Sequence, residues 1–127
     1  MNSNSLCKSG QIVKLEHNQY CLYAEVIQVV TTRQMYWVRP LMLLEFSSEP
    51  ALRDDPQSHK FYNLRDSSDL IWPFNLFQPA LDTEVIPLLV ELDSTHEKNS
   101  NTKAIAHQQL RSFVHKVWQA DPDSFPR

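Results

Sequence analysis

Two long segments with high β propensity, separated by four polar residues, constrain this chain more than any other feature. Residues 20–30 and 35–46 are rich in β-branched, aromatic and other apolar side chains, and residues 31–34 separate them. Runs of this composition divided by a short polar connection are typical of a β-hairpin. Pro40 interrupts the second run. Because proline cannot donate a ladder hydrogen bond, Pro40 predicts an edge, a bulge or a bend within this strand.

The predicted hairpin is apolar on both faces, whereas an antiparallel sheet usually leaves one face to water. If Val30 pairs with Met35, one face carries Cys21, Tyr23, Ile27, Val29, Tyr36, Val38, Pro40, Met42 and Leu44. Glu25 falls on the same face, and this charged residue in an apolar row points to a bulge that shifts the register. The other face carries Leu22, Ala24, Val26, Gln28, Val30, Met35, Trp37, Arg39, Leu41 and Leu43. Either the C-terminal helix or a protein partner must cover this second face.

The rest of the chain predicts short strands and one clear helix. Alternation and turn residues indicate strands at residues 10–15, 61–65 and 70–72, a polar loop at 47–60 and a polar linker at 93–103. Residues 82–92 fit a helix or a strand, and Asp82 as a possible N-cap favours the helix. Residues 104–119 predict an amphipathic helix, with an apolar face formed by Ala106, Leu110, Phe113, Val114, Val117 and Trp118.

These elements predict a single, mainly β (α+β) domain over residues 1–127. Five strands with a long loop after the central hairpin indicate a small SH3-like antiparallel barrel or a bent sheet at residues 10–92, with a C-terminal amphipathic helix. Residues 1–9 and 120–127 are expected to be flexible tails. The length of 127 residues fits one domain that folds without disulfides or metals.

The charge distribution and the single glycine exclude several classes of function. Residues 41–97 carry a net charge of −8 within a chain of net charge −3, and such an acidic middle disfavours nucleic-acid binding. Gly10 is the only glycine, whereas phosphate-binding loops need several so that the backbone can approach the anion. The chain is therefore expected to lack a P-loop, a dinucleotide-binding fingerprint and a kinase-type glycine loop.

Membrane and secretion signals are also missing from the sequence. No segment approaches the roughly 20 apolar residues of a membrane span, and the first ten residues lack the apolar region of a signal peptide. The expected location is the cytoplasm, where a disulfide between the two cysteines would not persist. Cys21, in an apolar run, is interpreted as a buried small hydrophobic residue, and Cys7 as part of the N-terminal tail.

Three segments, AEVIQVV, TRQMYWVRPLML and SDLIWPFNLFQPALDTEVIPLL, resemble short uncharacterised proteins of cyanobacteria. The resemblance covers about residues 10–92. It implies a cytoplasmic location and an accessory or assembly role in a photosynthetic or carbon-fixation complex. It transfers no catalytic residue, because its motifs are not specific to a chemistry.

No catalytic or metal-binding motif stands out, so we expect neither an enzyme nor a cofactor. The five histidines include no pair at the i, i+4 spacing that a helical metal site uses, and Arg111 lies between His107 and His115. No GxSxG nucleophile elbow is present. The acidic pairs in polar loops lack the apolar surroundings that raise the pKa of a catalytic acid.

The predicted function is that of a non-catalytic protein–protein interaction module, with a small nucleic-acid-binding barrel as the alternative. The expected partner is a protein or a peptide tail, with a homodimer as competitor, and neither nucleic acid nor membrane is expected. Tryptophan and arginine dominate binding hot spots because they combine contact area with directed hydrogen bonds. The predicted partner-binding residues, from the second face of the hairpin and the aromatic segment after it, are Arg33, Met35, Trp37, Arg39, Trp72 and Phe74.

Overall fold

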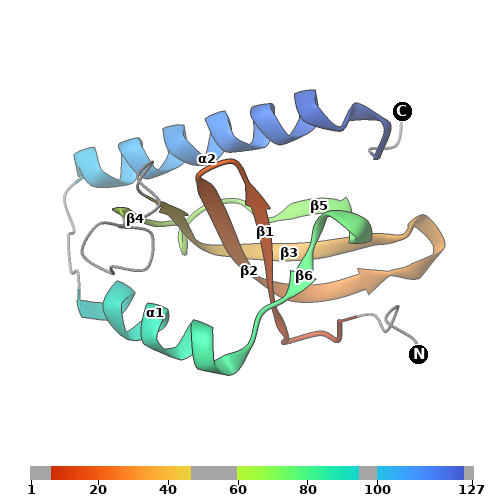
Figure 1. The fold of residues 1–127 in the computed structure, drawn as a ribbon, viewed down its shortest axis with the longest axis horizontal. Helices are drawn as coiled ribbons and strands as arrows, with labels where there is room; N and C mark the ends of the chain where they lie inside the picture. Colours follow the sequence, from red (N-terminus) through yellow and green to blue (C-terminus); the bar gives the residue numbers. More distant parts are fainter. Residues whose placement is uncertain (1–6, 47–59, 95–99, 125–127) are drawn as a thin grey trace.

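The computed structural model describes residues 7–46, 60–94 and 100–124 (Figure 1). They form an antiparallel sheet with a helix on each side, which confirms the mainly β (α+β) class. The strands are β1 (Ile12–His17), β2 (Tyr20–Val30), β3 (Met35–Glu45), β4 (Lys60–Asn63), β5 (Leu70–Pro73) and β6 (Gln78–Pro79). The helices are α1 (Asp82–Ser94) and α2 (Ser100–Ala120), and the 3-10 turns are η1 (Thr31–Arg33), η4 (Phe74–Leu76) and η5 (Pro122–Ser124).

The sheet is bent and is not closed into a barrel. Its strand order is β4-β3-β2-β1-β6, and β5 pairs with β3 beside β4. The pairing of β4 with β3 begins at Met42, and that of β5 ends at Val38. Pro40 lies in the gap between these two partners, where the strand needs no further ladder donor, so a buried proline is tolerated in the middle of a long strand.

Two compensating β-bulges explain the position of Glu25. The predicted pairing of Val30 with Met35 is correct, and the same register returns at Tyr23 and Met42. Between these points the register shifts twice, leaving Ile27 of β2 and Leu41 of β3 without an opposite residue. As a result, Val29, Tyr36 and Val38 join Leu22, Ala24, Val26 and Leu43 in one core cluster, so the two predicted faces exchange residues along the hairpin.

With a single glycine available, two turns use other residues in the left-handed region. Gly10 has a φ of 89°, while Asn18 and Gln34 both have a φ of 56°. Asn18 lies in the β1–β2 turn, and Gln34 follows η1 at the end of the β2–β3 hairpin. Asparagine is one of the residues that adopt this conformation most readily. Gln34 is unusual there, and its N–H donates to the Thr31 carbonyl to close the turn.

Helix α2 packs on one face of the sheet and buries the larger core cluster. Its buried side chains recur every three or four residues, as a helix facing a core requires: Ala106, Leu110, Phe113 and Val117. Phe113 lies 6.2 Å from the Tyr20 ring, and the Lys116 ammonium lies 5.5 Å from the same ring. Trp118 was predicted on the apolar face, but half of it is exposed.

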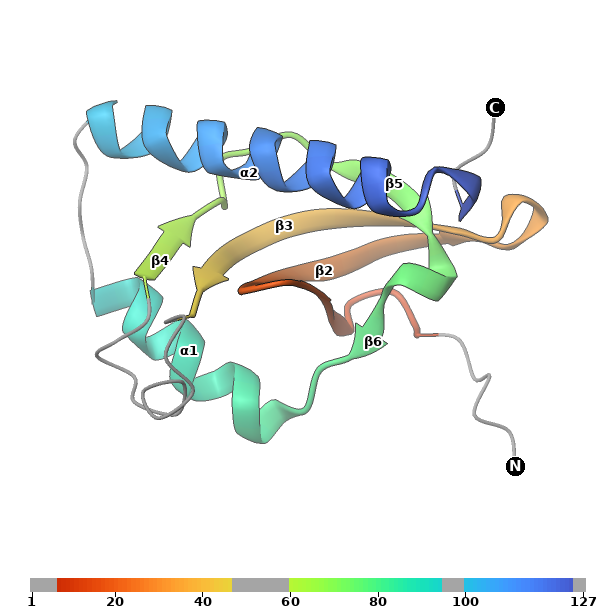
Figure 2. The same cartoon turned by 45° about the horizontal axis from the view of Figure 1, so that its top comes forward.

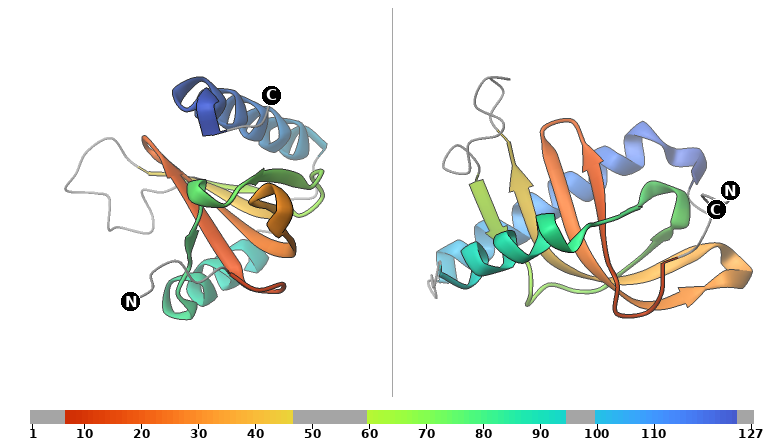
Figure 3. Two further views of the ribbon diagram at one scale, coloured as in Figure 1. Left: turned by 90° about the vertical axis from the view of Figure 1, so that its right-hand side faces the viewer. Right: turned by 60° about the horizontal axis from the view of Figure 1, so that its bottom comes forward.

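Helix α1 covers part of the opposite face. Of the predicted second face of the hairpin, Leu22, Ala24, Val26 and Leu43 pack under the C-terminal helix α2, whereas α1 covers members of the predicted first face. Figure 3 shows the sheet between α2 and α1. The cluster beneath α1 contains Cys21, Tyr23, Met42, Leu44, Ala80, Val85 and Leu92. The segment that fitted a helix or a strand is thus a helix. Pro87 lies inside it, and since both Pro87 and Thr83 are exposed, the Thr83 carbonyl that receives no N–H from Pro87 is not enclosed in the core.

Several predicted boundaries were wrong. Both helices extend into the predicted linker 93–103, because α1 ends at Ser94 and α2 begins at Ser100. Cys7 was assigned to a flexible tail, but it is buried, and its N–H donates to the Tyr36 hydroxyl over 2.9 Å. A sixth strand, β6, was not predicted. Most of the predicted polar loop 47–60 lies outside the described residues.

Glu84 ties α1 to the sheet through Lys14 and Tyr23, and a third hydrogen bond closes the start of its own helix. Its carboxylate accepts from Lys14 Nζ (3.0 Å), the Tyr23 hydroxyl (2.8 Å) and the Leu81 N–H (3.1 Å). Partial burial alone would raise the pKa of Glu84, but these three donors outweigh it and hold the pKa below its ordinary value. The charged form of Glu84 therefore stabilises the docked position of α1.

We expect Glu84→Gln to lower the free energy of unfolding by about 1.5–3 kcal/mol at neutral pH, the usual contribution of hydrogen bonds to a charged group. Because the folded pKa of Glu84 is depressed, this contribution is complete above the unfolded pKa of about 4.3 and disappears as the pH falls through the folded pKa. Urea denaturation at several pH values should therefore show the two proteins converging in acid. The control Asp93→Asn, which breaks an exposed ion pair with Arg65, should cost less than about 1 kcal/mol. A pH-independent difference would contradict the assigned role.

Candidate functional site

The face of the sheet opposite α2 is only partly covered, and the uncovered part carries the candidate binding surface. Figures 1 and 2 show α1 near β4 and the C-terminal end of β3, whereas the β2–β3 turn lies at the other end of the sheet, well beyond α1. Directly paired residues of an antiparallel sheet share a face. Trp37 is paired with Gln28 on one side and Ile71 on the other, and Arg39 is paired with Glu25. We call these five residues, together with Asp69, the open face.

Asp69 holds the two most prominent side chains of the open face together. Its carboxylate accepts from Trp37 Nε1 over 2.8 Å and from Arg39 Nε and Nη2 over 3.1 and 3.4 Å. The hydrogen bonds from Arg39 first, and from Trp37 second, hold the pKa of Asp69 below its ordinary value. A carboxylate shared in this way fixes the Trp37 indole and the Arg39 guanidinium in one orientation, which reduces the entropy that a partner would have to remove.

Arg39 is the most exposed charged side chain of the open face, which carries one positive and two negative charges. Arg39 is exposed, whereas the two acids nearest to it, Glu25 and Asp69, are partly buried. The exposed Arg33 lies in η1 at the end of the same hairpin. Ile71 is 55% exposed and adds apolar area next to Trp37. The surface therefore combines exposed apolar area with one exposed guanidinium group that is paired with Asp69.

The structure brings together only part of the predicted site. Trp37 and Arg39 are neighbours on the open face, as predicted. Arg33 is exposed but separated from them along the hairpin, and Met35 is 6% exposed, so it contributes little contact area.

Trp72 and Phe74 do not belong to this surface. Trp72 pairs directly with Tyr36 and is 6% exposed within the core cluster beneath α2. The Phe74 ring lies 4.9 Å from the Tyr36 ring and packs against the same cluster. Both side chains therefore lie on the α2 side of the sheet, and the aromatic segment fills the core there.

Sequence reasoning missed Ile71 and Asp69. Both depend on the pairing of β5 with β3, which is a contact between residues more than 30 positions apart. A partial signal was available, because Trp37 and Arg39 occupy alternate positions of one strand and their donors require an acceptor. An acid next to a short apolar strand was a candidate for that acceptor.

The two cysteines lie in different core clusters and are not placed for chemistry. Both are free thiols, and Cys21 is buried beneath α1, which raises the pKa of its thiol to about 12. A thiol in this state is a poor nucleophile. In the part of the chain that the structure describes, no group of three or more His, Cys, Asp or Glu side chains is arranged to hold a metal ion.

Comparison with protein-family models, curated proteins and solved structures finds no match to this chain. Among residues 7–46, 60–94 and 100–124, no helix is both long and apolar enough to cross a membrane.

Proposed function

We propose that this protein is a non-catalytic protein-binding module and that its partner docks on the open face. The observation that carries the proposal is the shared carboxylate of Asp69, which orders Trp37 and Arg39 on a surface that no element of the described chain covers. Tryptophan and arginine are the residues most enriched in binding hot spots. An ordered pair of them beside the exposed Ile71 supports a role in recognition.

The chemistry of the open face favours a peptide segment with an apolar side chain next to a carboxylate. The apolar side chain would pack on Trp37 and Ile71, which lie on adjacent strands. Asp69 occupies Nε and Nη2 of Arg39, which leaves Nη1 to donate outward to an acid of the partner.

The proposal is tested by selecting peptides from a random library displayed on phage against the folded protein. We expect the enriched peptides to contain an acidic residue beside an apolar one. Trp37→Ala should weaken the binding of a synthetic peptide from this selection by roughly thirtyfold, as expected for a hot spot worth about 2 kcal/mol. Isothermal titration calorimetry provides the dissociation constants.

Trp118→Ala is the matched control, because Trp118 is an exposed tryptophan on α2, on the other side of the sheet. This variant should bind the peptide as tightly as the original protein does. If Trp37→Ala does not fold, Ile71→Ser removes apolar area at a residue that is 55% exposed and should still weaken binding. Selected peptides that bind Ile71→Ser and Arg39→Gln with unchanged affinity would show that the open face is not the binding surface.

Self-association and nucleic-acid binding are the competing outcomes. Sedimentation analysis showing a dimer that Ile71→Ser dissociates would assign the open face to a second copy of this chain. A salt-sensitive, submicromolar affinity for an oligonucleotide would contradict the argument from the acidic middle segment. The accessory role in a cyanobacterial complex rests on the sequence resemblance alone and remains a prediction.

A further inference from the structure

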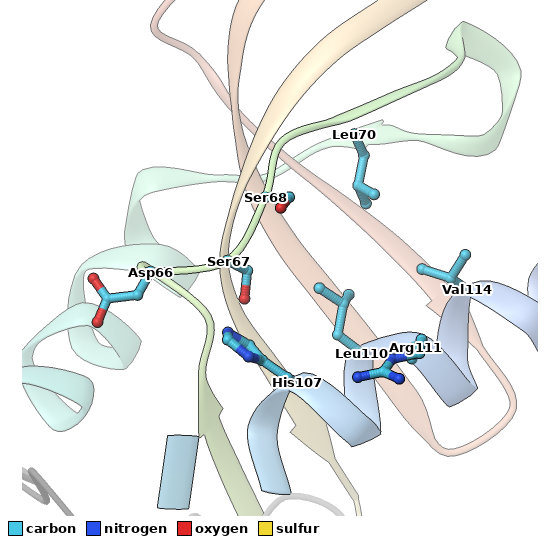
Figure 4. A pocket seen from close by; sticks show the side chains of 8 residues that line it. All are labelled: Asp66, Ser67, Ser68, Leu70, His107, Leu110, Arg111 and Val114. Carbon is cyan, nitrogen blue, oxygen red and sulfur yellow. The ribbon is translucent and has the colours of Figure 1, made fainter. Parts of the chain in front are cut away.

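A pocket lies between α2 and the chain that leads into β5, on the opposite side of the sheet from the open face (Figure 4). Its volume is about 360 Å³, and it is lined by Asp66, Ser67, Ser68, Leu70, His107, Leu110, Arg111 and Val114. Pockets that hold small molecules span roughly 300–1,000 Å³. The pocket is therefore large enough for a small organic ligand.

Hydrogen-bonding groups converge on this pocket. The Ser67 hydroxyl oxygen is buried, and among the described residues it has no hydrogen-bond partner. Figure 4 shows the Ser67 hydroxyl and the His107 imidazole turned toward one another across the pocket. A buried hydroxyl without a partner is unfavourable and uncommon in folded proteins. A ligand oxygen between these two groups would satisfy the hydroxyl.

The balance of charge at the pocket favours an anion. Arg111 makes no ion pair with any residue that the structure describes. The one acid in the lining, Asp66, is engaged by Lys103 over 3.3 Å, and its carboxylate points away from the pocket in Figure 4. The guanidinium of Arg111 is therefore the uncompensated charge, and its fork of N–H groups matches a carboxylate.

The floor of the pocket is apolar. Leu110 is 8% exposed in the core cluster, and the partly buried Leu70 and Val114 pack against that cluster. These three side chains offer a surface for an aliphatic or aromatic group, and Figure 4 shows Ser67 and His107 on one side of Leu110 and Arg111 on the other. An apolar floor with a few convergent polar groups is the usual composition of a small-molecule site.

We propose that this pocket binds a carboxylate attached to a short apolar body. Arg111 pairs with the carboxylate, Ser67 and His107 donate hydrogen bonds to it, and the body packs on Leu70, Leu110 and Val114. The proposal is independent of the open face, because the two surfaces share no residue and lie on opposite sides of the sheet.

The test uses octanoate as the probe and octan-1-ol as its uncharged counterpart, both followed by two-dimensional NMR of the full chain at neutral pH. Octanoate is expected to bind saturably and to shift amide signals of α2 and of residues 66–70. Octan-1-ol should bind the original protein at least tenfold more weakly than octanoate does. The variant Arg111→Gln should bind octanoate at least tenfold more weakly than the original protein does. His107→Gln should also weaken binding, whereas His115→Gln, which changes an exposed histidine of the same helix outside the lining, should not.

A second arm uses N-acetyl-leucine, which offers the same carboxylate on an apolar body with the amide of a peptide terminus. If this probe binds more tightly than octanoate does, the pocket is assigned to the C-terminal residue of a peptide. If it binds more weakly, the pocket is assigned to a free organic acid. Any of three results would overturn the proposal. Octanoate and octan-1-ol could bind equally well, Arg111→Gln could bind octanoate with unchanged affinity, or neither acid could show saturable binding up to about 10 mM.

Discussion

Phe113→Ala is expected to lower the free energy of unfolding by about 3–5 kcal/mol, the usual cost of removing a buried phenylalanine ring. Phe113 is 2% exposed and is one of the largest fully enclosed side chains on the α2 side of the sheet. Its ring contacts those of Tyr20 and His17, at centroid distances of 6.2 and 6.4 Å. The substitution would therefore leave a cavity between α2 and the β1–β2 hairpin.

Urea denaturation measures the loss, and an unchanged slope would confirm that both proteins expose the same surface on unfolding. Trp118→Ala is the control, because it removes an even larger side chain from the same helix. Trp118 is half exposed, so this change should cost less than about 1 kcal/mol. Equal losses in the two variants would contradict the orientation of α2 on the sheet.

The two residues also show what helical periodicity could predict. The buried positions 106, 110, 113 and 117 follow the expected spacing, and the sequence predicted all four. Trp118 lies at the edge of the same stripe, since neighbouring residues are about 100° apart around a helix. Whether such a residue is buried depends on the width of the surface below it. That width is set by the sheet, and the helix sequence contains no information about it.

The central hairpin shows a different limit. Its strand bounds and its end pairing could be predicted. The need for a bulge could also be predicted, because Glu25 conflicted with an apolar row. The positions of the bulges could not. Each strand carries one extra residue, Ile27 in β2 and Leu41 in β3, so the two shifts cancel and both ends of the hairpin keep the same register. Each bulge shifts the alternation of its own strand, so the turn end of the hairpin exchanges faces relative to the open end, and a pattern with a period of two residues cannot reveal this.

The candidate site was predicted in part for the same reason. Trp37 and Arg39 occupy alternate positions of one strand, so their common face follows from β geometry alone. Placing Trp72 beside them required knowing how β5 pairs with β3. A shift of one residue exchanges Ile71 and Trp72 between the two faces, and a strand of four residues contains too little pattern to fix that choice.

Leu92→Ala is expected to lower the free energy of unfolding by about 2–5 kcal/mol and to loosen α1 from the sheet. Leu92 is 1% exposed and lies in the last turns of α1, where it packs in the same cluster as Cys21, Val85 and Leu44. Helix α1 forms part of a small cluster at one end of the sheet, and such elements can open without global unfolding. The variant should therefore populate a state in which α1 is undocked.

Thiol labelling followed by peptide mapping measures this opening, because Cys21 is buried beneath α1 and Cys7 lies in the other core cluster. If labelling follows the opening equilibrium, a loss of 2 kcal/mol corresponds to a roughly thirtyfold faster reaction of Cys21. The rate at Cys7 is the internal reference and should change much less. Val90→Ala, at a position of α1 that is 63% exposed, should leave both rates nearly unchanged. Equal acceleration at both cysteines in Leu92→Ala would show that α1 opens only with the whole domain, and no acceleration at Cys21 would show that α1 does not protect this face of the sheet.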